Sequence, residues 1–247
     1  MRGADSFLRS IHQPPQERRD AIHQARALFE RALQIDPNDA SALAGSANTY
    51  QNERLFGLGD PSTDYEAKVL GQVDRAIALD PNDVRAYSIK ANYLNLSRRP
   101  SEALDVANAG LAINSNWVGL YFQRAVAENS LGRYEQAKAD IVRALRLSPR
   151  HPEFGWFHVV EGDAEINLGH FDAAIDAYRK AIDLHAFPVY TNLAAAYAHE
   201  GQMDEAKAAL AEARRLNPAI TIKWMKEHTP NLPAVFDGLR KAGLPEE

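Results

Sequence analysis

Histidine and carboxylate side chains are the groups of this chain that could carry metal or acid–base chemistry. Its eight histidines form no HExxH sequence, and none lies three or four residues from another, the spacing that would place two imidazoles around zinc on one helix face. His151 and His158 flank an expected turn and are the pair that could meet in space. The sequence has no cysteine, so it offers no thiolate ligand, cysteine nucleophile or disulfide. We expect no metal and no cofactor.

Two loop sequences share some letters with ligand-binding motifs. GLGDPST, residues 57–63, lacks the lysine of a phosphate-binding loop, and we expect Asp60 to cap a helix that begins at Pro61. The DPND sequences that begin at Asp36 and Asp80 lack the 12-residue spacing and closing glutamate of an EF-hand. We expect them to cap helices.

No catalytic constellation is evident. The GxSxG turn of a serine hydrolase and the GxxxxGK[ST] loop of a nucleotide-binding enzyme are both missing from the sequence. Its many carboxylates fall mostly on outward helix faces, without the pocket that a glycosidase pair needs. We therefore predict no catalytic residue and keep a free-standing enzyme as the competing class.

Composition and charge narrow the partners. The chain is 45% hydrophobic and 25% charged, which favours a folded protein over a disordered one. Its net charge of −5 argues against a nucleic-acid binder, and the short basic pairs Arg98-Arg99 and Arg214-Arg215 are typical of solvated helix surfaces. The first 20 residues lack the apolar core of a signal peptide, and no stretch approaches the ~18 apolar residues of a membrane helix.

Small residues recur along the chain at a regular interval. In the second helix of each expected unit most of them lie at or near 34 residues apart, and the first interval is stretched by an insertion at residues 54–64. A companion series lies seven residues earlier, which is nearly two helical turns, so both share one helix face and let neighbouring helices approach closely. The second-helix series is Ala32, Ala76, Gly110, Ala144, Ala181 and Ala213, and a series in the preceding helices is Ala47, Ala91, Ala125, Gly162 and Ala194.

Larger apolar residues and turn residues complete the pattern. Ile141 and Tyr178 lie between the small residues of their helices, where they fill the space between neighbours. Gly132, Gly169 and Gly201 mark a tight turn between the two helices of a unit. Proline with Asp, Asn or Ser ends the units, because proline cannot continue a helix and the polar residues cap the next one.

This period and these residues resemble the tetratricopeptide repeat (TPR). The resemblance implies an all-α fold, a right-handed superhelical α-solenoid whose first helices line a concave groove. Residues 118–151 carry the family's residues at the family's offsets: Tyr121, Ala125, Leu131, Gly132, Tyr134, Ala137, Ile141, Ala144 and Pro149.

We predict a single TPR solenoid domain over residues 1–247. TIKWMKEH, residues 221–228, is expected to be a short helix, and a C-terminal cap is predicted over residues 220–247. At the other end Phe7, Leu8 and Ile11 form one short apolar face. The last helix should carry one apolar stripe and cover the end of the stack; its residues are Leu232, Val235, Phe236 and Leu239. The six helix pairs are expected at approximately 5–39, 40–83, 84–117, 118–152, 153–186 and 187–219.

A second resemblance concerns the origin of the chain. GLRKAGLPEE (residues 238–247), the AEARRLNPAITIKWMKEHTP before it and ALFERALQIDPNDASALAG (residues 27–45) are similar to the TPR region of bacterial class III adenylate/guanylate cyclase-like proteins. The resemblance implies a C-terminal regulatory region of a signal-transduction protein in cAMP signalling. The cyclase catalytic domain would lie outside this chain.

The candidate binding residues lie on the first helices, at positions that the repeat pattern does not assign to packing. Asn and Gln both donate and accept hydrogen bonds and so suit the backbone of an extended peptide. Phe122 and Trp156 would supply apolar anchors. The alternative is that the Asn side chains satisfy nearby backbone or water. The peptide- or protein-binding candidates are Asn48, Arg85, Asn92, Asn95, Phe122, Gln123, Asn129, Trp156 and Asn192, with Gln51, Ser88 and His199 also on this face.

The sequence thus predicts a non-catalytic interaction scaffold that binds a peptide or neighbouring domain in its concave groove. The alternative is the TPR portion of a nucleotide cyclase. The partner is a protein or peptide, with no nucleic acid and no membrane insertion, and a homodimer is left open. We expect a cytoplasmic location, or a periplasmic one if the chain is attached to an upstream transmembrane segment.

Overall fold

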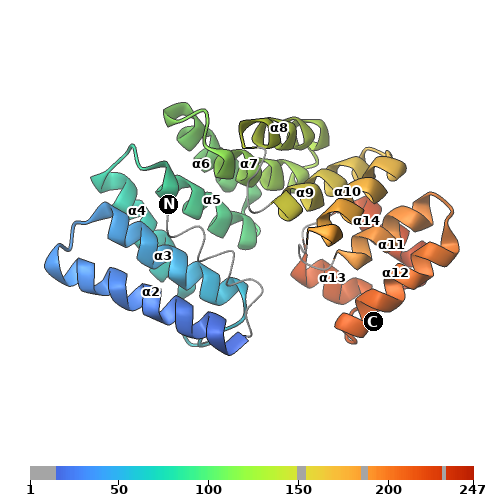
Figure 1. Ribbon diagram of the computed structural model, residues 1–247, viewed down its shortest axis with the longest axis horizontal. Helices are drawn as coiled ribbons and strands as arrows, with labels where there is room; N and C mark the ends of the chain where they lie inside the picture. The colour runs from blue at the N-terminus through green and yellow to red at the C-terminus, as the bar shows by residue number, and fades with distance from the viewer. Residues whose placement is uncertain (1–14, 149–153, 185–188, 230–231) are drawn as a thin grey trace. The chain divides into compact units, whose positions relative to one another are not determined.

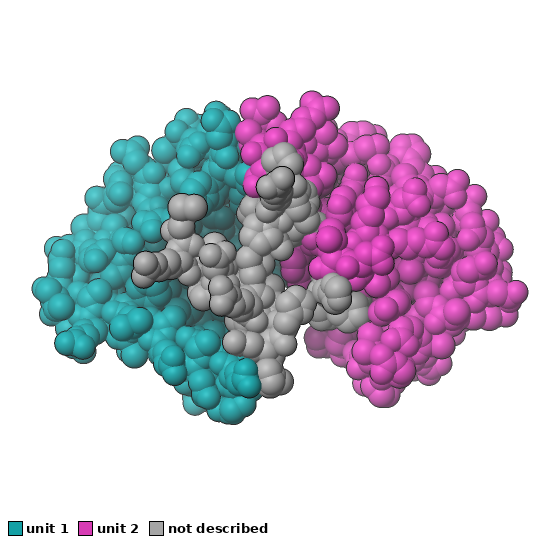
Figure 2. Space-filling model, in the orientation of Figure 1, with its two compact units in different colours: residues 1–123 teal, residues 124–247 magenta. Residues whose placement is uncertain are grey.

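The structure is a computed structural model of the 247-residue chain. Within the residues it describes there are 13 α-helices and no β-strand, which confirms the predicted all-α class (Figure 1). The chain divides into two compact units, unit 1 (residues 1–123) and unit 2 (residues 124–247), which are coloured separately in Figure 2. The described residues are 15–148, 154–184, 189–229 and 232–247.

The helices alternate between a first and a second helix of each pair, as the repeat pattern predicts. The expected units from residue 40 to residue 219 each contain two helices. In unit 1 the helices are α2 (Pro15–Ile35), α3 (Ala40–Leu55), α4 (Tyr65–Leu79), α5 (Val84–Leu96) and α6 (Pro100–Ile113), and α7 (Val118–Ser130) spans the boundary between the units. In unit 2 they are α8 (Tyr134–Leu147), α9 (Phe154–Asn167), α10 (Phe171–Asp183), α11 (Tyr190–His199), α12 (Met203–Leu216), α13 (Ile222–His228) and α14 (Pro233–Lys241).

The turn between the two helices of a pair is the same in four pairs. Gly132, Gly169 and Gly201 have φ values of 74°, 80° and 81°, in the left-handed region that glycine adopts without steric cost, which confirms the predicted turn glycines. The following residue closes the turn with a backbone bond to the carbonyl five residues earlier; His170 N donates to Glu165 O at 2.9 Å. Arg98 holds the same place between α5 and α6 with a φ of 58°.

Aspartates of the DPND sequences cap helices, as predicted. Asp39, the last residue of the first copy, accepts a hydrogen bond from Ala42 N at 2.9 Å at the start of α3. Asp83 does the same for Arg85 N at 3.1 Å at the start of α5. These bonds satisfy N–H groups that a first helical turn leaves without partners.

The prediction that Asp60 caps a helix starting at Pro61 is wrong. The helix α4 begins four residues later at Tyr65, and its N-cap is Asp64, whose carboxylate accepts from Ala67 N at 3.0 Å. Asp60 instead accepts from the backbone N and the hydroxyl of Ser62, which closes a local turn. The sequence therefore contains two candidate N-caps. The first, Asp60, closes the turn, and the second, Asp64, caps the helix.

Small residues bring the two helices of each pair into contact. The predicted first-helix series is buried throughout: Ala47, Ala91, Ala125, Gly162 and Ala194. Side-chain size is matched across one contact, because Gly162 faces the ring of Tyr178. A Cβ at residue 162 would lie 2.5 Å from Tyr178 Cε1, closer than real contacts allow. A helix pair therefore admits either a bulky ring or a methyl group at this point.

The C-terminal cap has the predicted helices. α13 covers the short expected helix, and the four residues of the apolar stripe on the α14 segment are all at most 5% exposed, whereas Asp237, Arg240 and Lys241 are exposed. The tail after α14 returns to α13, where Ile222 N donates to Pro245 O at 2.9 Å. The N-terminal face of Phe7, Leu8 and Ile11, the first helix of the first pair and His151 lie outside the described residues.

We predict that Gly162→Ala lowers the free energy of unfolding by about 2 kcal/mol, because the added methyl group forces Tyr178 out of a filled core. Urea denaturation followed by circular dichroism measures the change. Gly71→Ala is the matched control: residue 71 lies within α4, where a Cβ meets nothing within 4 Å. This change should raise the free energy of unfolding by about 1 kcal/mol. Equal effects of the two substitutions would contradict the size-matched contact.

Candidate functional site

The first helices of unit 1 present a polar surface formed by α3 and α5. On each helix two polar residues lie seven positions apart, on one face: Ser41 and Asn48 on α3, Arg85 and Asn92 on α5. Arg85 Nη2 donates to Ser41 Oγ at 3.1 Å, so the two faces are neighbours. We call these four residues the unit 1 surface.

Arg85 keeps its charge available on this surface. Its guanidinium also pairs with the Asp83 carboxylate, at 2.7 Å between Nη2 and Oδ2, while 54% of its side chain stays exposed. The hydrogen bonds from Arg85 to Asp83 outweigh the effect of burial and raise the pKa of the guanidinium above its usual value. A cation that is fixed at one side and exposed at the other can accept an additional carboxylate.

Asn48 and Asn92 hold equivalent positions in consecutive pairs, directly after the buried small residues Ala47 and Ala91. Both are half-buried. Among the described residues neither side-chain amide has a hydrogen-bond partner. Each therefore has a donor and an acceptor available for a ligand or for water.

Three other predicted site residues hold neighbouring repeats together. Asn95 Nδ2 donates to the backbone O of Gln123 at 2.9 Å, and Asn129 Nδ2 donates to the backbone O of Val160 at 2.9 Å. Gln123 and Asn129 are only 7% and 3% exposed. These two bonds form the same link from the end of one first helix to the middle of the next, so Asn95 and Asn129 support the stack, and Asn129 in addition is buried.

Asn192 belongs to a buried polar group in unit 2. Its Nδ2 donates to Asp163 Oδ1 at 2.8 Å, and the hydroxyl of Tyr178 donates to the same oxygen at 2.9 Å. Burial raises the pKa of Asp163 to about 6, against the opposing effect of these two hydrogen bonds. Asn192 therefore has a structural partner, and this partner is a carboxylate side chain and not the backbone or water considered from the sequence.

The two predicted aromatic anchors are placed as expected on first helices. Phe122 lies on α7 and Trp156 on α9, and both side chains are half-buried. Both also make contacts within the fold. Each therefore combines a packing role with a partly exposed apolar face.

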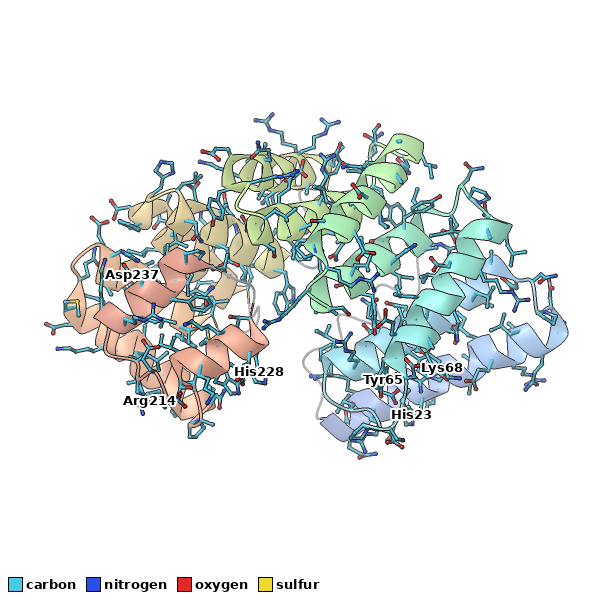
Figure 3. The ribbon with its side chains drawn as sticks, turned by 180° about the vertical axis from the view of Figure 1, so that it is seen from behind. His23, Tyr65, Lys68, Arg214, His228 and Asp237 are labelled. Atoms are coloured by element: carbon cyan, nitrogen blue, oxygen red, sulfur yellow. The ribbon has the colours of Figure 1, made fainter. Side chains whose placement is uncertain are left out.

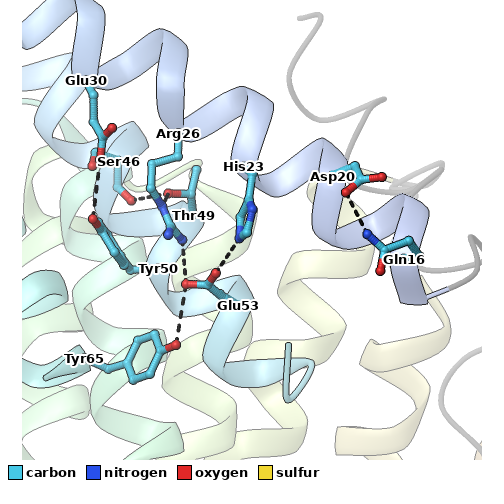
Figure 4. A network of polar contacts seen from close by, with 10 residues as sticks. All are labelled: Gln16, Asp20, His23, Arg26, Glu30, Ser46, Thr49, Tyr50, Glu53 and Tyr65. Carbon is cyan, nitrogen blue, oxygen red and sulfur yellow. Dashed lines mark hydrogen bonds and ion pairs between the residues drawn. The ribbon is translucent and has the colours of Figure 1, made fainter. Parts of the chain in front are cut away.

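A polar network in unit 1 was not predicted from the sequence (Figure 4). The Glu53 carboxylate on α3 is hydrogen-bonded to His23 Nε2 and to Arg26 Nη2 on α2, both at 2.8 Å. The Arg26 guanidinium also lies 3.7 Å from the centre of the Tyr50 ring. In Figure 3, His23 and Tyr65 lie close together on unit 1, and Tyr65 donates to Glu53 Oε2 at 3.5 Å.

The network has the composition of an acid–base site but the electrostatics of a structural one. Burial raises the pKa of Glu53, and hydrogen bonds from Arg26 and His23 more than offset it, so the pKa lies below its usual value. A carboxylate with several donors stays charged and does not act readily as an acid. One feature of the sequence could have indicated this network: Glu53 lies on the face of α3 that packs against α2, where a carboxylate needs partners.

A second buried carboxylate lies at the start of unit 2. Glu128 on α7 is 8% exposed, and its Oε2 has no partner among the described residues. Its neighbour Asp140 is bound by Arg124, with 2.5 Å between Nε and Oδ2. Burial raises the pKa of Glu128 to about 7, and the Asp140 carboxylate adds to this effect. Near neutral pH the Glu128 carboxyl therefore keeps its proton in part of the folded molecules.

Two further findings on the described residues bear on other functions. Within the part of the chain that the structure describes, no three His, Asp or Glu side chains gather in a way that could hold a metal ion. Over the same residues, no helix combines the length and the apolar character needed to cross a membrane.

The helix pairs, their glycine turns and their small-residue contacts define an α-solenoid protein built from helical repeats. Two segments of this solenoid, residues 118–151 and residues 159–219, each match a family model of the tetratricopeptide repeat. The matched segments coincide with the α7–α8 pair and with the two pairs from α9 to α12.

Solved structures share this fold. The chain is similar to a thermophilic TPR protein of Thermus thermophilus, at 24% identity and a TM-score of 0.55 over 74% of this chain and 91% of that one. It is similar to a chain of the APC/C hetero-tetramer Cut9-Hcn1 at 19% identity and a TM-score of 0.72, over 90% of this chain and 39% of that one. It is also similar to YrrB, a TPR protein with an unusual peptide-binding site, at 19% identity and a TM-score of 0.52, over 77% and 93%. At these identities the likeness establishes the fold.

We predict that the free energy of unfolding falls as the pH rises from about 4.5 to about 7. The folded chain keeps the Glu128 proton through this interval, whereas an unfolded chain releases it near the ordinary value of 4.5. Glu128→Gln supplies a permanent N–H donor in place of the proton, so at pH 8 it should raise the free energy of unfolding by about 2 kcal/mol.

Urea denaturation at pH 5 and pH 8 measures this effect, and the substitution should matter least at the lower pH. The control Glu135→Gln changes an exposed residue in the first turn of α8 and should shift stability by less than about 0.5 kcal/mol at either pH. A pH profile of Glu128→Gln that parallels wild type would refute the raised pKa of Glu128.

Proposed function

We propose that this chain is a non-catalytic protein-interaction scaffold, and that the unit 1 surface binds an extended peptide segment of a partner protein or a neighbouring domain. The observation that carries the proposal is the pair Asn48 and Asn92. Their amides stand at equivalent positions of consecutive repeats and have no partner among the described residues. Two consecutive repeats thus offer the same amide one repeat apart, which suits a ligand that is itself periodic.

An extended peptide has that periodicity in its backbone. Each amide side chain can donate to a peptide carbonyl and accept from a peptide N–H, so the interaction is independent of the peptide's side chains. Arg85 adds selectivity for a peptide with a carboxylate beside the bound backbone through its Nη1 donors, because Nε and Nη2 are already bonded to Asp83 and Ser41. We therefore propose an acidic segment as the ligand.

The other predicted site residues take graded roles in this proposal. Phe122 would anchor an apolar side chain of the ligand at the α7 end of the surface. Asn95, Gln123 and Asn129 act as positioning residues that fix consecutive first helices. Trp156 and Asn192 in unit 2 remain candidates for a separate contact. The fold also supports a binding role by analogy, since YrrB shares it and has a peptide-binding site.

Peptides selected from a random display library on the immobilised chain test the proposal. We expect the selected peptides to be acidic and to lose about tenfold or more in affinity for the double variant Asn48→Ala/Asn92→Ala, because two hydrogen bonds of about 1 kcal/mol each are removed. The free energy of unfolding should change by less than about 0.5 kcal/mol, since neither amide is bound within the described fold.

Asn108→Ala is the matched control, an exposed asparagine on the second helix α6. It should leave peptide affinity unchanged. Selected peptides that bind the double variant as tightly as wild type would rule out the unit 1 surface. Peptides lost only with Trp156→Ala would move the site to unit 2.

A second proposal concerns the larger protein to which the scaffold would belong. We also propose, from the resemblance suggested by the sequences of residues 27–45 and 238–247, that the scaffold is a regulatory region of a signalling protein, located in the cytoplasm, or in the periplasm if a transmembrane segment precedes it. The DNA upstream of the codon for Met1 tests this. An in-frame class III catalytic domain is the expected finding, and a separate promoter and start codon at that point would contradict this proposal.

A further inference from the structure

The last helix does not continue the stacking of the repeats. In other parts of the chain the first helix of a pair packs against the second helix before it, as α5 does on α4, α9 on α8 and α11 on α10. The helix α14 packs most extensively on α11, a first helix, and also on α9, the first helix of the preceding pair (Figure 1). It therefore lies across the first helices of two consecutive repeats.

This position is the face on which the sequence predicts ligand binding. Asn192 and His199, both candidates, lie seven residues apart on one face of α11, with Ala195 between them. His199 Nε2 is hydrogen-bonded to the backbone O of Ala234 in α14 at 2.8 Å, and its ring stacks on Phe171 with 4.6 Å between ring centres. The chain's own C-terminal helix thus covers the His199 end of this face.

The backbone of α14 is bound from two repeats at once. Leu232, the N-cap of α14, provides no capping hydrogen bond from its side chain, which leaves the first N–H groups of the helix to find partners elsewhere. Asn167 of α9 fills this role, since its Oδ1 accepts from Ala234 N at 3.1 Å. Asn167 is oriented by its own Nδ2, which donates to Asp163 O at 2.8 Å. The backbone N–H and the backbone C=O of Ala234 are therefore both hydrogen-bonded by side chains of first helices, Asn167 on α9 and His199 on α11.

The surface of α9 and α11 also restricts which side chains a docked helix can carry. The apolar stripe of α14 is buried against other helices of unit 2; its residues are Leu232, Val235, Phe236 and Leu239. At Gly238 the two helices are in closest contact, and a Cβ there would lie 2.5 Å from Ala195 O, a backbone atom that cannot move aside. The surface accepts a helix with apolar residues at i, i+3, i+4 and i+7 and a glycine at i+6.

We propose that this face of α9 and α11 is a binding site for an amphipathic helix of a partner protein with the pattern of α14, and that α14 occupies the site in the free chain. Contacts to backbone atoms do not depend on the identity of the ligand, so another helix with the same apolar pattern and glycine satisfies them. A helix of nine residues is not stable alone in water, so α14 is helical when docked and unfolds when displaced. The proposal is independent of the unit 1 surface.

Tethering explains how the site is kept closed. A segment joined to its site by a short connection competes at an effective concentration on the order of millimolar, so a partner helix of equal intrinsic affinity binds the free chain weakly. Loosening α14 should therefore increase the affinity for a helix added in trans. This behaviour separates a ligand-like helix from a permanent part of the core.

A fluorescein-labelled synthetic peptide of residues 229–247 is the probe, titrated by anisotropy into the full chain. We expect the Gly238→Ala chain to bind it at least tenfold more tightly than wild type, because its own α14 docks poorly while Ala195 and His199 are intact. A peptide that carries Gly238→Ala should bind the same chain at least tenfold more weakly. The Gly71→Ala chain, with the same substitution at an open helical position, should behave as wild type.

Circular dichroism first establishes that the Gly238→Ala chain is folded. A folded chain that binds the peptide no better than wild type would overturn the proposal. Hydrogen exchange on the wild-type chain decides the case in which the variant does not fold: the amides of α14 should exchange at least tenfold faster than those of α11, and equal protection would overturn the proposal. Dimers of the wild-type chain that exchange α14 would overturn the partner-protein assignment and give the site to a second copy.

Discussion

Close contact between two helices at a single small residue is the constraint on which the rest of this structure depends. A helix pair can bury its shared face only if the first helix has no side chain larger than a methyl group at the crossing, and Ala47, Ala91 and Ala125 meet this condition. Where the second helix places an aromatic ring at this contact, the first helix has a glycine instead of an alanine, as at Gly162 against Tyr178. With the helices held this close, the turn between them has to reverse the chain in a few residues, which requires the left-handed conformation seen at Gly169.

The same closeness determines what the polar side chains of the first helices can do. A polar group near the end of a first helix lies within reach of the next first helix, and the amides of Asn95 and Asn129 are used there to bind backbone carbonyls. In unit 1 the amides one position past the small residue, Asn48 and Asn92, retain their donors among the described residues, whereas Asp163 at the equivalent position of α9 is buried and bonded to Tyr178 and Asn192. One residue type therefore has two functions along one helix, and position relative to the crossing decides between them.

This distinction explains which features were predictable from the sequence. The period of the small residues, the turn glycines and the apolar stripe of α14 are local patterns, so they could be read directly. The expectation that Asp60 caps a helix was wrong because two candidate caps lie four residues apart and only the turn geometry selects Asp64. The link from Asn129 to Val160 spans 31 residues and three helices, and no local pattern contains it. The bond between Glu53 and His23 was missed for the same reason.

The end of a repeat stack sets a physical problem that α14 solves in a particular way. The last pair exposes an apolar face, and a cap that simply extended the stack would leave the first-helix face of α9 and α11 open. By lying on that face, α14 buries apolar surface of its own and of unit 2, and it gives up the self-capping of a stable helix for a hydrogen bond to Asn167. Because Asn167 of α9 completes the hydrogen bonds of its first turn, α14 should lose its helical structure when it is displaced from this face. Stability and recognition are therefore served by one set of contacts, and any ligand for this face has to replace them in full.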